Sequence, residues 1–172
     1  TKDLDGGALL NQASHYVDLL EWIIGPLDGL YANVSTISRN IEVEDTAVMQ
    51  LKWVNGALGS MSVTMITFPK NIEGSITIIG DKGRAKVGGI AVNEFEYSYF
   101  EDESNTCLEK YNYKTKSVYG FGHNFYYQNM IDNLINNTKP ICDGEGGLSS
   151  IKIINAAYKS AKEQRFIKLS SI

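Results

Sequence analysis

The sequence has little cysteine and no long hydrophobic run. Its 172 residues include two cysteines, Cys107 and Cys142, whose separation fits no zinc pattern, and CxxC does not occur. Two cysteines in a chain of this length do not make a disulfide framework, so we expect two free thiols. The longest apolar candidate, residues 19–24, is interrupted by Glu21 and is far shorter than the roughly 20 residues of a membrane helix. These absences indicate a cytoplasmic protein that does not interact with membranes.

Motifs for several chemistries are also missing. The net charge is −4 and the basic residues are scattered, which argues against nucleic-acid binding but leaves room for an anionic small ligand. GxGxxG is absent, so no parallel Rossmann unit is expected. HExxH and GxSxG are absent as well, so neither a metal centre nor a serine triad is expected. The glycine cluster at 80–83 is interpreted as a hairpin turn, and the one at 144–147 as a loop before a helix, with an anion site as the alternative.

The length and the first residues bound the domain organisation. A chain of 172 residues with 43% apolar and 21% charged residues is long enough for one domain with its own core. It begins at Thr1 with neither Met nor a signal peptide and passes from a short loop directly into a helix. We therefore expect residues 1–172 to form a single domain that is a fragment of a longer protein.

The spacing of apolar residues predicts helices near both ends of the chain. Steps of three and four predict one apolar stripe on a first helix that ends at Gly25-Pro26. That stripe consists of Leu10, Ala13, Val17, Leu20 and Ile24. A second helix is predicted around Tyr127 and Leu134. The stripe of the last helix is predicted to be Ile151, Ile154, Tyr158 and Ala161.

The middle of the chain is rich in predicted strands, followed by an acidic, polar loop at 101–106. The strands are expected at residues 30–38, 46–53, 57–68, 73–79, 84–87 and 91–100, with a closing edge strand at 166–169. A two-residue Asn55-Gly56 loop would set Trp53 opposite Leu58 and leave both sheet faces partly apolar. The order of elements predicts an α+β fold with an open, mostly antiparallel sheet and helices on one face. A partner subunit is expected on the other face, which makes a homo-oligomer.

A polar line on the first helix is the best candidate for chemistry. Asn11 and His15 are four residues apart and therefore neighbours on one face, and Asp18 continues the line. Histidine suits proton transfer near neutral pH, and an adjacent carboxylate can orient it. An amide beside it can hold a sugar hydroxyl through its donor and its acceptor. The alternative is a solvated helix face with an incidental histidine.

Four further residues are candidate ligand contacts. His123 follows two glycines interleaved with aromatic residues, including Tyr119, which fits either a backbone close to a ligand or a tight turn with aromatic plugs. Arg39 follows a strand. It either binds a carboxylate or phosphate of a ligand or is a surface charge at the end of the strand. Lys70 lies in a proline-containing loop and either meets an anion or belongs to a polar turn.

The first helix carries a recognisable motif, Gly6-Gly7-Ala8-Leu9-Leu10-Asn11-Gln12-Ala13-Ser14-His15-Tyr16-Val17-Asp18. With Glu44-Asp45-Thr46-Ala47, Asn55-Gly56-Ala57-Leu58-Gly59 and Glu73-Gly74-Ser75-Ile76, in this order, it resembles the C-terminal domain of the Gfo/Idh/MocA oxidoreductase family. Within the family the chain is most similar to dehydrogenases that oxidise UDP-N-acetylglucosaminuronic acid at carbon three, in bacterial surface-polysaccharide synthesis. The cues for that group are residues 11–16, 67–71 and 117–123.

The resemblance implies a two-domain enzyme in which this chain binds the substrate. It implies an N-terminal Rossmann domain that holds NAD or NADP and a catalytic lysine in a Glu-Lys-Pro motif, neither of which this sequence contains. It implies His15 as a catalytic residue. The implied substrate-binding residues are Asn11, Gln12, Ser14, Arg39, Lys70, Tyr119 and His123. The family often has Asp where this chain has Asn11, which places more of the proton transfer on His15 and the lysine. The fragment alone is expected to be inactive.

Overall fold

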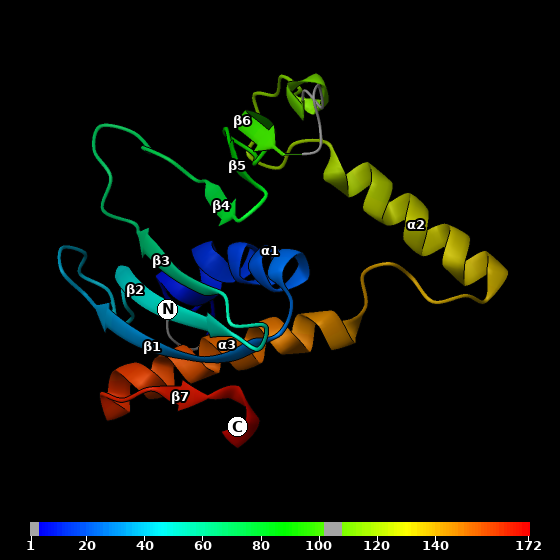
Figure 1. Cartoon of the computed structure of the whole chain (residues 1–172). Coiled ribbons are helices and arrows are strands. Elements are labelled where there is room, and N and C mark those ends of the chain that lie inside the picture. The colour runs from blue at the N-terminus through cyan, green and yellow to red at the C-terminus, as the bar shows by residue number, and fades with distance from the viewer. Residues whose placement is uncertain (1–3, 102–107) are drawn as a thin grey trace. The chain divides into compact units, whose positions relative to one another are not determined.

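A computed structural model of the chain describes residues 4–101 and 108–172 (Figure 1). The chain divides into two compact units, which are described separately. Unit 1 comprises residues 1–69 and 143–172, and unit 2 comprises residues 70–142. Most of the predicted polar loop and Cys107 lie outside the described residues, whereas Cys142 is an exposed free thiol. That residues 1–172 act as a single functional domain stays a prediction.

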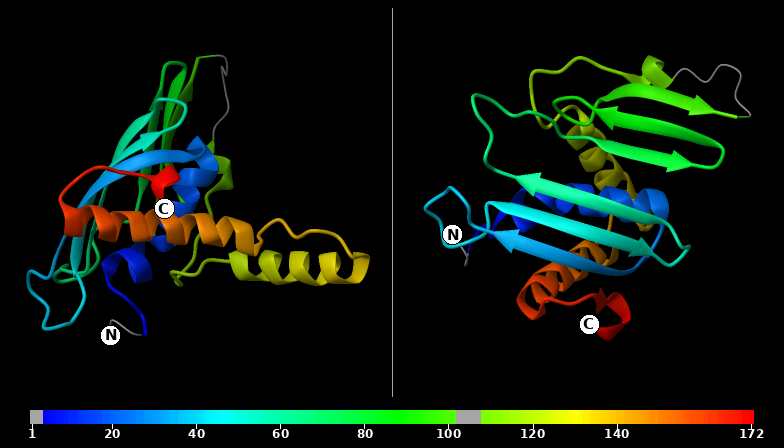
Figure 2. Two further views of the ribbon diagram at one scale, coloured as in Figure 1. Left: turned by 90° about the horizontal axis from the view of Figure 1, so that it is seen from below. Right: turned by 60° about the vertical axis from the view of Figure 1, so that its left-hand side comes forward.

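Unit 1 packs helices on one face of a four-stranded sheet and leaves the other face open (Figure 2). Its elements are a π-helical turn η1 (Ala8–Ala13), α1 (Ser14–Ile24), β1 (Leu27–Ser35), β2 (Thr46–Trp53), β3 (Leu58–Thr64), α3 (Gly144–Glu163), β7 (Ile167–Lys168) and a short 3-10 helix, η3 (Leu169–Ser171). The strand order is β3-β2-β1-β7, and neighbouring strands are antiparallel. The predicted α+β class is confirmed.

Unit 2 contains a second, three-stranded sheet in the order β4-β5-β6, again antiparallel. Its elements are β4 (Ile76–Gly80), β5 (Gly83–Gly88), β6 (Glu94–Phe100), a 3-10 turn η2 (Leu108–Tyr111) and α2 (Gly122–Asn136). β4 and β5 join at the glycine cluster 80–83, so its interpretation as a hairpin turn is confirmed. On this sheet, Lys86 forms ion pairs with Glu73 at 2.7 Å and Glu96 at 3.0 Å.

The core of unit 1 follows from alternation along the strands. Alternate residues of β2 point inward, so Met49, Leu51 and Trp53 are buried while Val48, Gln50 and Lys52 are exposed. The helices close the core with Leu9, Ala13 and Val17 from η1 and α1, and with Ile153, Ile154 and Ala157 from α3. Burial of this apolar surface is the main stabilising contribution in unit 1.

The first helix differs from its prediction at its N-terminal end. Leu10 was expected in the apolar stripe, but it is 40% exposed, and Leu9 is fully buried in its place. The cause is the π-helical geometry of η1, because a π turn has more residues than an α turn. The buried positions Leu9, Ala13 and Val17 therefore recur every fourth residue.

The predicted register of the β2–β3 hairpin is wrong by one residue. The loop has three residues, Val54 to Gly56, because Gly56 adopts a φ of 92° and extends the turn. Lys52 consequently pairs with Leu58, and Met49 pairs with Met61. A one-residue shift moves every side chain of a strand to the opposite face of the sheet.

This register makes the open face of unit 1 more polar than predicted. On β3, Met61 and Val63 pack against the core, whereas Ser60, Ser62 and Thr64 share the open face with Val48 of β2. The open face is thus largely hydroxyl-bearing, with Val48 and Leu58 as exposed apolar side chains. The expectation of a partner subunit rested on both sheet faces being partly apolar. Because the open face is more polar than that, this argument for a partner is weaker.

The last helix begins earlier than predicted. Residues 144–147, expected to be a loop, form the first turn of α3, because Asp143 caps the helix by accepting hydrogen bonds from the backbone N–H groups of Glu145 and Gly146. Its buried positions include Ile153, Ile154 and Ala157, whereas Ile151 is 50% exposed.

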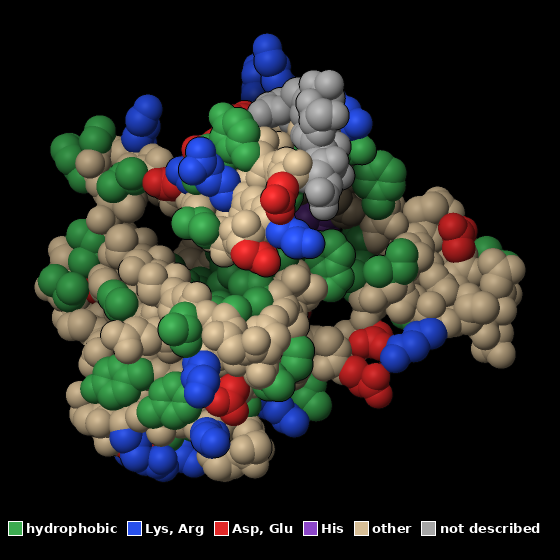
Figure 3. Space-filling view, viewed as in Figure 1, with side chains coloured by type: hydrophobic (Ala, Val, Ile, Leu, Met, Phe, Trp, Pro, Cys, Tyr) green, Lys and Arg blue, Asp and Glu red, His purple; other side chains and the backbone are tan. Residues whose placement is uncertain are grey.

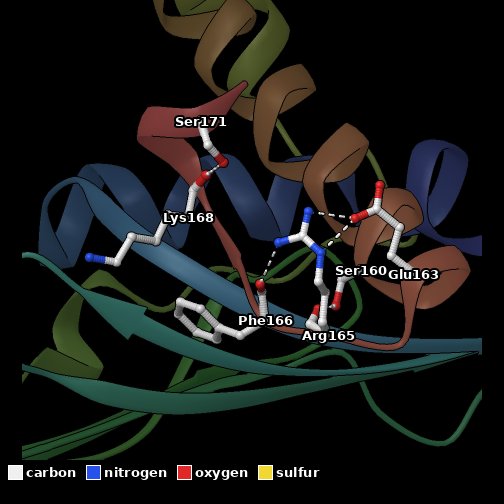
Figure 4. Close-up of polar contacts among 6 residues, drawn as sticks. All are labelled: Ser160, Glu163, Arg165, Phe166, Lys168 and Ser171. Atoms are coloured by element: carbon white, nitrogen blue, oxygen red, sulfur yellow. Dashed lines mark hydrogen bonds and ion pairs between the residues drawn. The ribbon is translucent and has the colours of Figure 1, made fainter.

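The predicted closing edge strand is present as β7, which pairs with β1. Figure 4 shows how the preceding turn is held. The fully buried Ser160 hydroxyl donates to the Arg165 carbonyl at 2.7 Å and accepts from the backbone N–H of Ala32 at 2.9 Å. Arg165 also pairs with Glu163. These contacts bind the end of α3 to β1, so the sheet is completed only by the C-terminal residues.

Candidate active site

The start of the first helix is anchored by a buried carboxylate. Glu44 is 7% exposed, and its Oε1 accepts hydrogen bonds from the backbone N–H of Leu9 and from the hydroxyl of Tyr158, each at 2.9 Å. The Glu44 carbonyl accepts from the N–H of Ala8 at 3.0 Å. A carboxylate that satisfies free N–H groups at a helix N-terminus is favourably placed. Glu44 therefore fixes η1 against α3 and the loop before β2.

Tyr158 belongs to the same anchor. Burial raises the pKa of its hydroxyl above the usual range, and the hydrogen bond to Glu44 raises it further. Because the phenol remains protonated, it can donate to the carboxylate throughout the neutral pH range.

Asp45, the next residue, shapes the loop between β1 and β2. It is fully buried, and its carboxylate accepts hydrogen bonds from the backbone N–H groups of Ile37, Ser38 and Arg39 at 2.9–3.1 Å, and from the Thr46 hydroxyl. Burial alone would raise the pKa of Asp45, but these hydrogen bonds together lower it well below its usual range. The loop is thus held by an ionised side chain.

His15 lies in the first turn of α1, directly after the π-helical turn, and its side chain is exposed. Asn11, in η1, is exposed too, and its Oδ1 accepts a hydrogen bond of 2.7 Å from Nε2 of Gln12. Ser14 is half-buried at the junction. The ring centroids of His15 and Tyr16 are 5.8 Å apart. Partial burial raises the pKa of the Tyr16 hydroxyl. The imidazole is therefore not a core histidine and is available to a ligand.

Asp18 has a different role from the predicted one. Its Oδ1 accepts a hydrogen bond of 2.9 Å from the hydroxyl of Ser150, which is buried in α3. The carboxylate that was expected to orient His15 instead ties α1 to α3. Asn11 and His15 remain as the polar pair on this helix.

Arg39 is exposed, and its side chain is partly engaged. Its Nη2 donates a hydrogen bond of 3.1 Å to the carbonyl of Met65, beyond the end of β3. Its position depends on Asp45, which accepts from its backbone N–H. The remaining guanidinium donors leave room for an anionic ligand.

The other predicted contacts, Lys70, Tyr119 and His123, lie in unit 2, and all three are exposed. The segment before α2 forms a tight turn, since the N–H of Gly120 donates to the carbonyl of Ser117 and the φ of Gly120 is 55°. The rings of Tyr119 and His123 meet edge to face, 5.7 Å apart. The tight turn is confirmed, and ligand contact by its two exposed rings stays a prediction.

A pocket in unit 1 lies away from these residues. It is lined by Val17, Leu20, Glu21, Leu27, Met49, Leu51, Trp53 and Ile153. The buried Nε1 of Trp53 has no hydrogen-bond partner among the described residues. Because almost every lining side chain belongs to the hydrophobic core, we regard this pocket as a packing feature, and it includes none of the predicted site residues.

The described residues offer neither a metal site nor a membrane-spanning helix. Within residues 4–101 and 108–172, no three His, Cys, Asp or Glu side chains gather so as to share a metal ion. No helix in the same part of the chain has the length and apolarity to cross a bilayer. On the face shown in Figure 3, the described basic side chains are interspersed with acidic and hydrophobic ones and form no continuous basic surface.

The sequence does not reveal the residues that hold the first helix and the loop between β1 and β2. It presents Glu44 and Asp45 only as part of a family motif, and Tyr158 only as a helix stripe residue. The available signal was Gly7, which has to be small because a Cβ would overlap the carboxylate of Glu44. That signal requires knowledge of which distant residue approaches the glycine.

Comparison with known proteins identifies the family. A family model described as "Oxidoreductase family, C-terminal alpha/beta domain" (GFO_IDH_MocA_C) matches residues 1–169. The chain therefore belongs to the Gfo/Idh/MocA oxidoreductase family and corresponds to its C-terminal domain. A search of curated proteins gives no match.

Two solved dehydrogenase structures resemble the chain at 50% sequence identity. The WlbA dehydrogenase from Bordetella pertussis, in complex with NADH and UDP-GlcNAcA, matches with a TM-score of 0.87 over 95% of this chain and 48% of its own. WlbA from Chromobacterium violaceum, with the same two ligands, matches with a TM-score of 0.83 over 95% and 46%. The chain thus spans about half the length of these structures. A levoglucosan dehydrogenase with NADH and levoglucosan, at 16% identity and a TM-score of 0.79, shows the shared fold.

The surroundings of Gly7 and Gly147 predict opposite effects on stability when each is replaced by alanine. Gly7→Ala should destabilise the protein by about 1–3 kcal/mol, because the new methyl group displaces Glu44 from its hydrogen bonds to Leu9 and Tyr158. Gly147→Ala, in the first turn of α3 with open space around it, should stabilise the protein by about 0.5–1 kcal/mol. Urea unfolding measures both, and equal effects would rule out the steric argument.

Asp45 predicts a pH-dependent contribution to stability. Because its folded pKa is lowered, its contribution is fully present above the unfolded value of about 4 and is lost as the pH falls through the folded value. Asp45→Asn should therefore lower the melting temperature at pH 7, and the difference from the wild type should shrink below about pH 4. Thermal unfolding at several pH values measures this, and a difference that is constant with pH would contradict it.

Proposed function

We propose that this chain is the substrate-binding part of an NAD-dependent dehydrogenase that oxidises carbon three of UDP-N-acetylglucosaminuronic acid. The observation that carries the proposal is the exposed imidazole of His15 beside Asn11, in a chain 50% identical to two dehydrogenases bound to NADH and UDP-GlcNAcA. The oxidation belongs to bacterial surface-polysaccharide biosynthesis and takes place in the cytoplasm.

His15 is the proton acceptor in the proposed reaction. The neutral imidazole accepts the proton of the substrate hydroxyl as the carbonyl forms, and a positioned base of this kind contributes about 10²–10⁴ to the rate. The family's lysine, which lies outside this chain, shares the role. Glu44 and Tyr158 determine where His15 lies, because their hydrogen bonds fix the start of the helix that carries it.

The polar residues around His15 hold the sugar. Asn11 and Gln12 present exposed amides, and Ser14 a hydroxyl, on the turn that leads to His15. Arg39 or Lys70 meets the uronate or the diphosphate through charge-assisted hydrogen bonds. Tyr119 and His123, which lie in unit 2, are proposed as substrate contacts from the sequence alone.

The nicotinamide cofactor is bound mainly by another part of the full-length enzyme. The described residues contain no strand that leads through a glycine-rich turn to a helix N-terminus, which is the unit that holds a dinucleotide pyrophosphate. NAD or NADP, held by the other half of the enzyme, supplies the hydride acceptor. The isolated chain is accordingly inactive.

Substitution of His15 tests the mechanism. In the full-length enzyme, His15→Asn should lower kcat by at least about tenfold, because the proton acceptor is lost. His123→Asn should raise KM with a smaller change in kcat, and Lys162→Asn, on the exposed end of α3, should leave both parameters unchanged. Circular dichroism controls for folding. An unchanged kcat in folded His15→Asn would remove His15 from the mechanism.

Ligand binding separates the proposal from its alternatives. The main alternative is another dehydrogenase of the family that acts on inositol or a free sugar. Calorimetry on the full-length enzyme should show binding of UDP-N-acetylglucosaminuronic acid at least about a hundredfold tighter than that of inositol or glucose. The isolated chain should show no micromolar binding of NAD. The opposite preference, or tight NAD binding by the fragment, would overturn the assignment.

A homo-oligomer is also part of the proposal. Unit 1 leaves one face of its sheet open, with Val48 and Leu58 exposed on it, and a second copy would cover that face. The chain would then serve as an oligomerisation module as well as a substrate-binding one. Sedimentation of the full-length enzyme as a monomer would contradict this.

A further inference from the structure

The loop between β1 and β2 is built around Asp45. The Asp45 carboxylate accepts hydrogen bonds from the backbone N–H groups of residues 37–39 at 2.9–3.1 Å. Its backbone joins the ends of two strands, because its N–H donates to the Ser35 carbonyl at 3.1 Å and its carbonyl accepts from the N–H of Met65 at 2.8 Å. Asp45 therefore fixes the loop to one end of the sheet of unit 1.

Arg39 is held in this arrangement by its backbone and by its side chain. Its backbone N–H donates to Oδ2 of Asp45 at 2.9 Å, and its Nη2 donates to the Met65 carbonyl at 3.1 Å. The N–H of Met65 in turn donates to the Asp45 carbonyl. Both attachments of Arg39 thus lead to Asp45. A guanidinium has five N–H donors, and the bond to Met65 uses one of them.

The loop that Asp45 orders adds nothing to the core of unit 1. None of the residues 36–42 belongs to that core. A fully buried carboxylate loses its hydration, and its hydrogen bonds have to offset this loss. Asp45 makes three of these bonds to the loop backbone, so they order a segment outside the core. This is the arrangement expected of a residue that supports a functional side chain.

The same end of the sheet carries the start of η1. Glu44, the residue before Asp45, accepts hydrogen bonds from the backbone N–H groups of the first two residues of η1. The π-helical turn also packs against β2 and β3, and Met65 directly follows β3. Two consecutive residues therefore hold the two segments that carry Asn11 and Arg39.

We propose that Asp45 is a positioning residue, which holds Arg39 so that its guanidinium binds an anionic group of the substrate. The inference rests on the proposed function, because it takes the substrate to be a sugar that carries a carboxylate and a diphosphate. A guanidinium binds either group through paired, charge-assisted hydrogen bonds. Asp45 acts only through Arg39 and does not itself contact the substrate.

Ligand binding to the full-length enzyme tests the role of Arg39. Calorimetry compares UDP-N-acetylglucosaminuronic acid with UDP-N-acetylglucosamine, which lacks the carboxylate. Arg39→Gln should weaken binding of the uronic acid at least about tenfold, because a charge-assisted hydrogen bond is lost. A parallel loss for UDP-N-acetylglucosamine assigns the diphosphate to Arg39, and an unchanged affinity for it assigns the carboxylate. Unchanged affinity for the uronic acid in folded Arg39→Gln would overturn the proposal.

A double-mutant cycle tests whether Asp45 acts through Arg39. Asp45→Asn should weaken binding of UDP-N-acetylglucosaminuronic acid at least about fivefold when Arg39 is present. In the Arg39→Gln background the same change should weaken binding less than about twofold, because the positioned group is already absent. A merely structural role would give the same loss in both backgrounds, and that result would remove Asp45 as a positioning residue.

Two further variants control for folding. Ser160→Ala removes another buried hydrogen-bonding side chain, between α3 and β1, and should lower the melting temperature while changing the affinity less than about twofold. Ser38→Gly loosens the loop outside the core and should weaken binding about threefold, so the test stands even where Asp45→Asn does not fold. Unchanged affinity in Ser38→Gly, or equal losses in Ser160→Ala and Asp45→Asn, would contradict the positioning role.

The proposed function and this inference fail in different ways. An unmodified full-length enzyme that does not bind the nucleotide sugar would overturn the proposed function and this inference with it. An enzyme that oxidises the nucleotide sugar and keeps its affinity in Arg39→Gln leaves the proposed function standing and removes only the role of Arg39 and Asp45.

Discussion

Unit 1 depends on one buried carboxylate that joins three parts of the chain. Glu44 accepts from the start of the π-helical turn at Leu9 and from Tyr158 in α3, while its own backbone precedes β2. A buried acceptor that lost these donors would be costly, so the three segments are held in one arrangement. The position of His15, a few residues beyond Leu9, is a consequence of that arrangement. The exposed side chains of the candidate site are thus positioned by residues that are themselves buried or half-buried.

The limits of the sequence are clearest in the β2–β3 hairpin and in the first helix. The strand at 46–53 and the turn at Asn55-Gly56 follow from local propensity, and both are present. The register was wrong because loops of two and three residues share the same Asn-Gly signal, and only packing against the core decides between them. The burial of Leu9 in place of Leu10 was missed for a similar reason, since a π turn has no pattern of its own in the sequence.

The candidate site was predictable only where a residue's role follows from its neighbours in the sequence. His15 and Asn11 could be named because a polar pair on an apolar helix is a local pattern, and both side chains are exposed. Asp18 could not be assigned correctly, because its partner Ser150 lies 132 residues away in the sequence. The family could also be predicted from the sequence. The motif on the first helix resembles the C-terminal domain of this oxidoreductase family, and the family model matches residues 1–169.

The interleaving of the two units bears on the order in which the chain folds. Unit 1 is made of residues 1–69 and 143–172, and its sheet and core are completed by α3 and β7. During synthesis on the ribosome, the residues of unit 2 therefore emerge in full while unit 1 still lacks its last helix and edge strand. The part of the sheet that α3 covers must wait for contacts of high sequence separation, which are slow to form. Until α3 and β7 have emerged, the apolar side chains that they bury remain exposed to solvent, and chaperones can bind them.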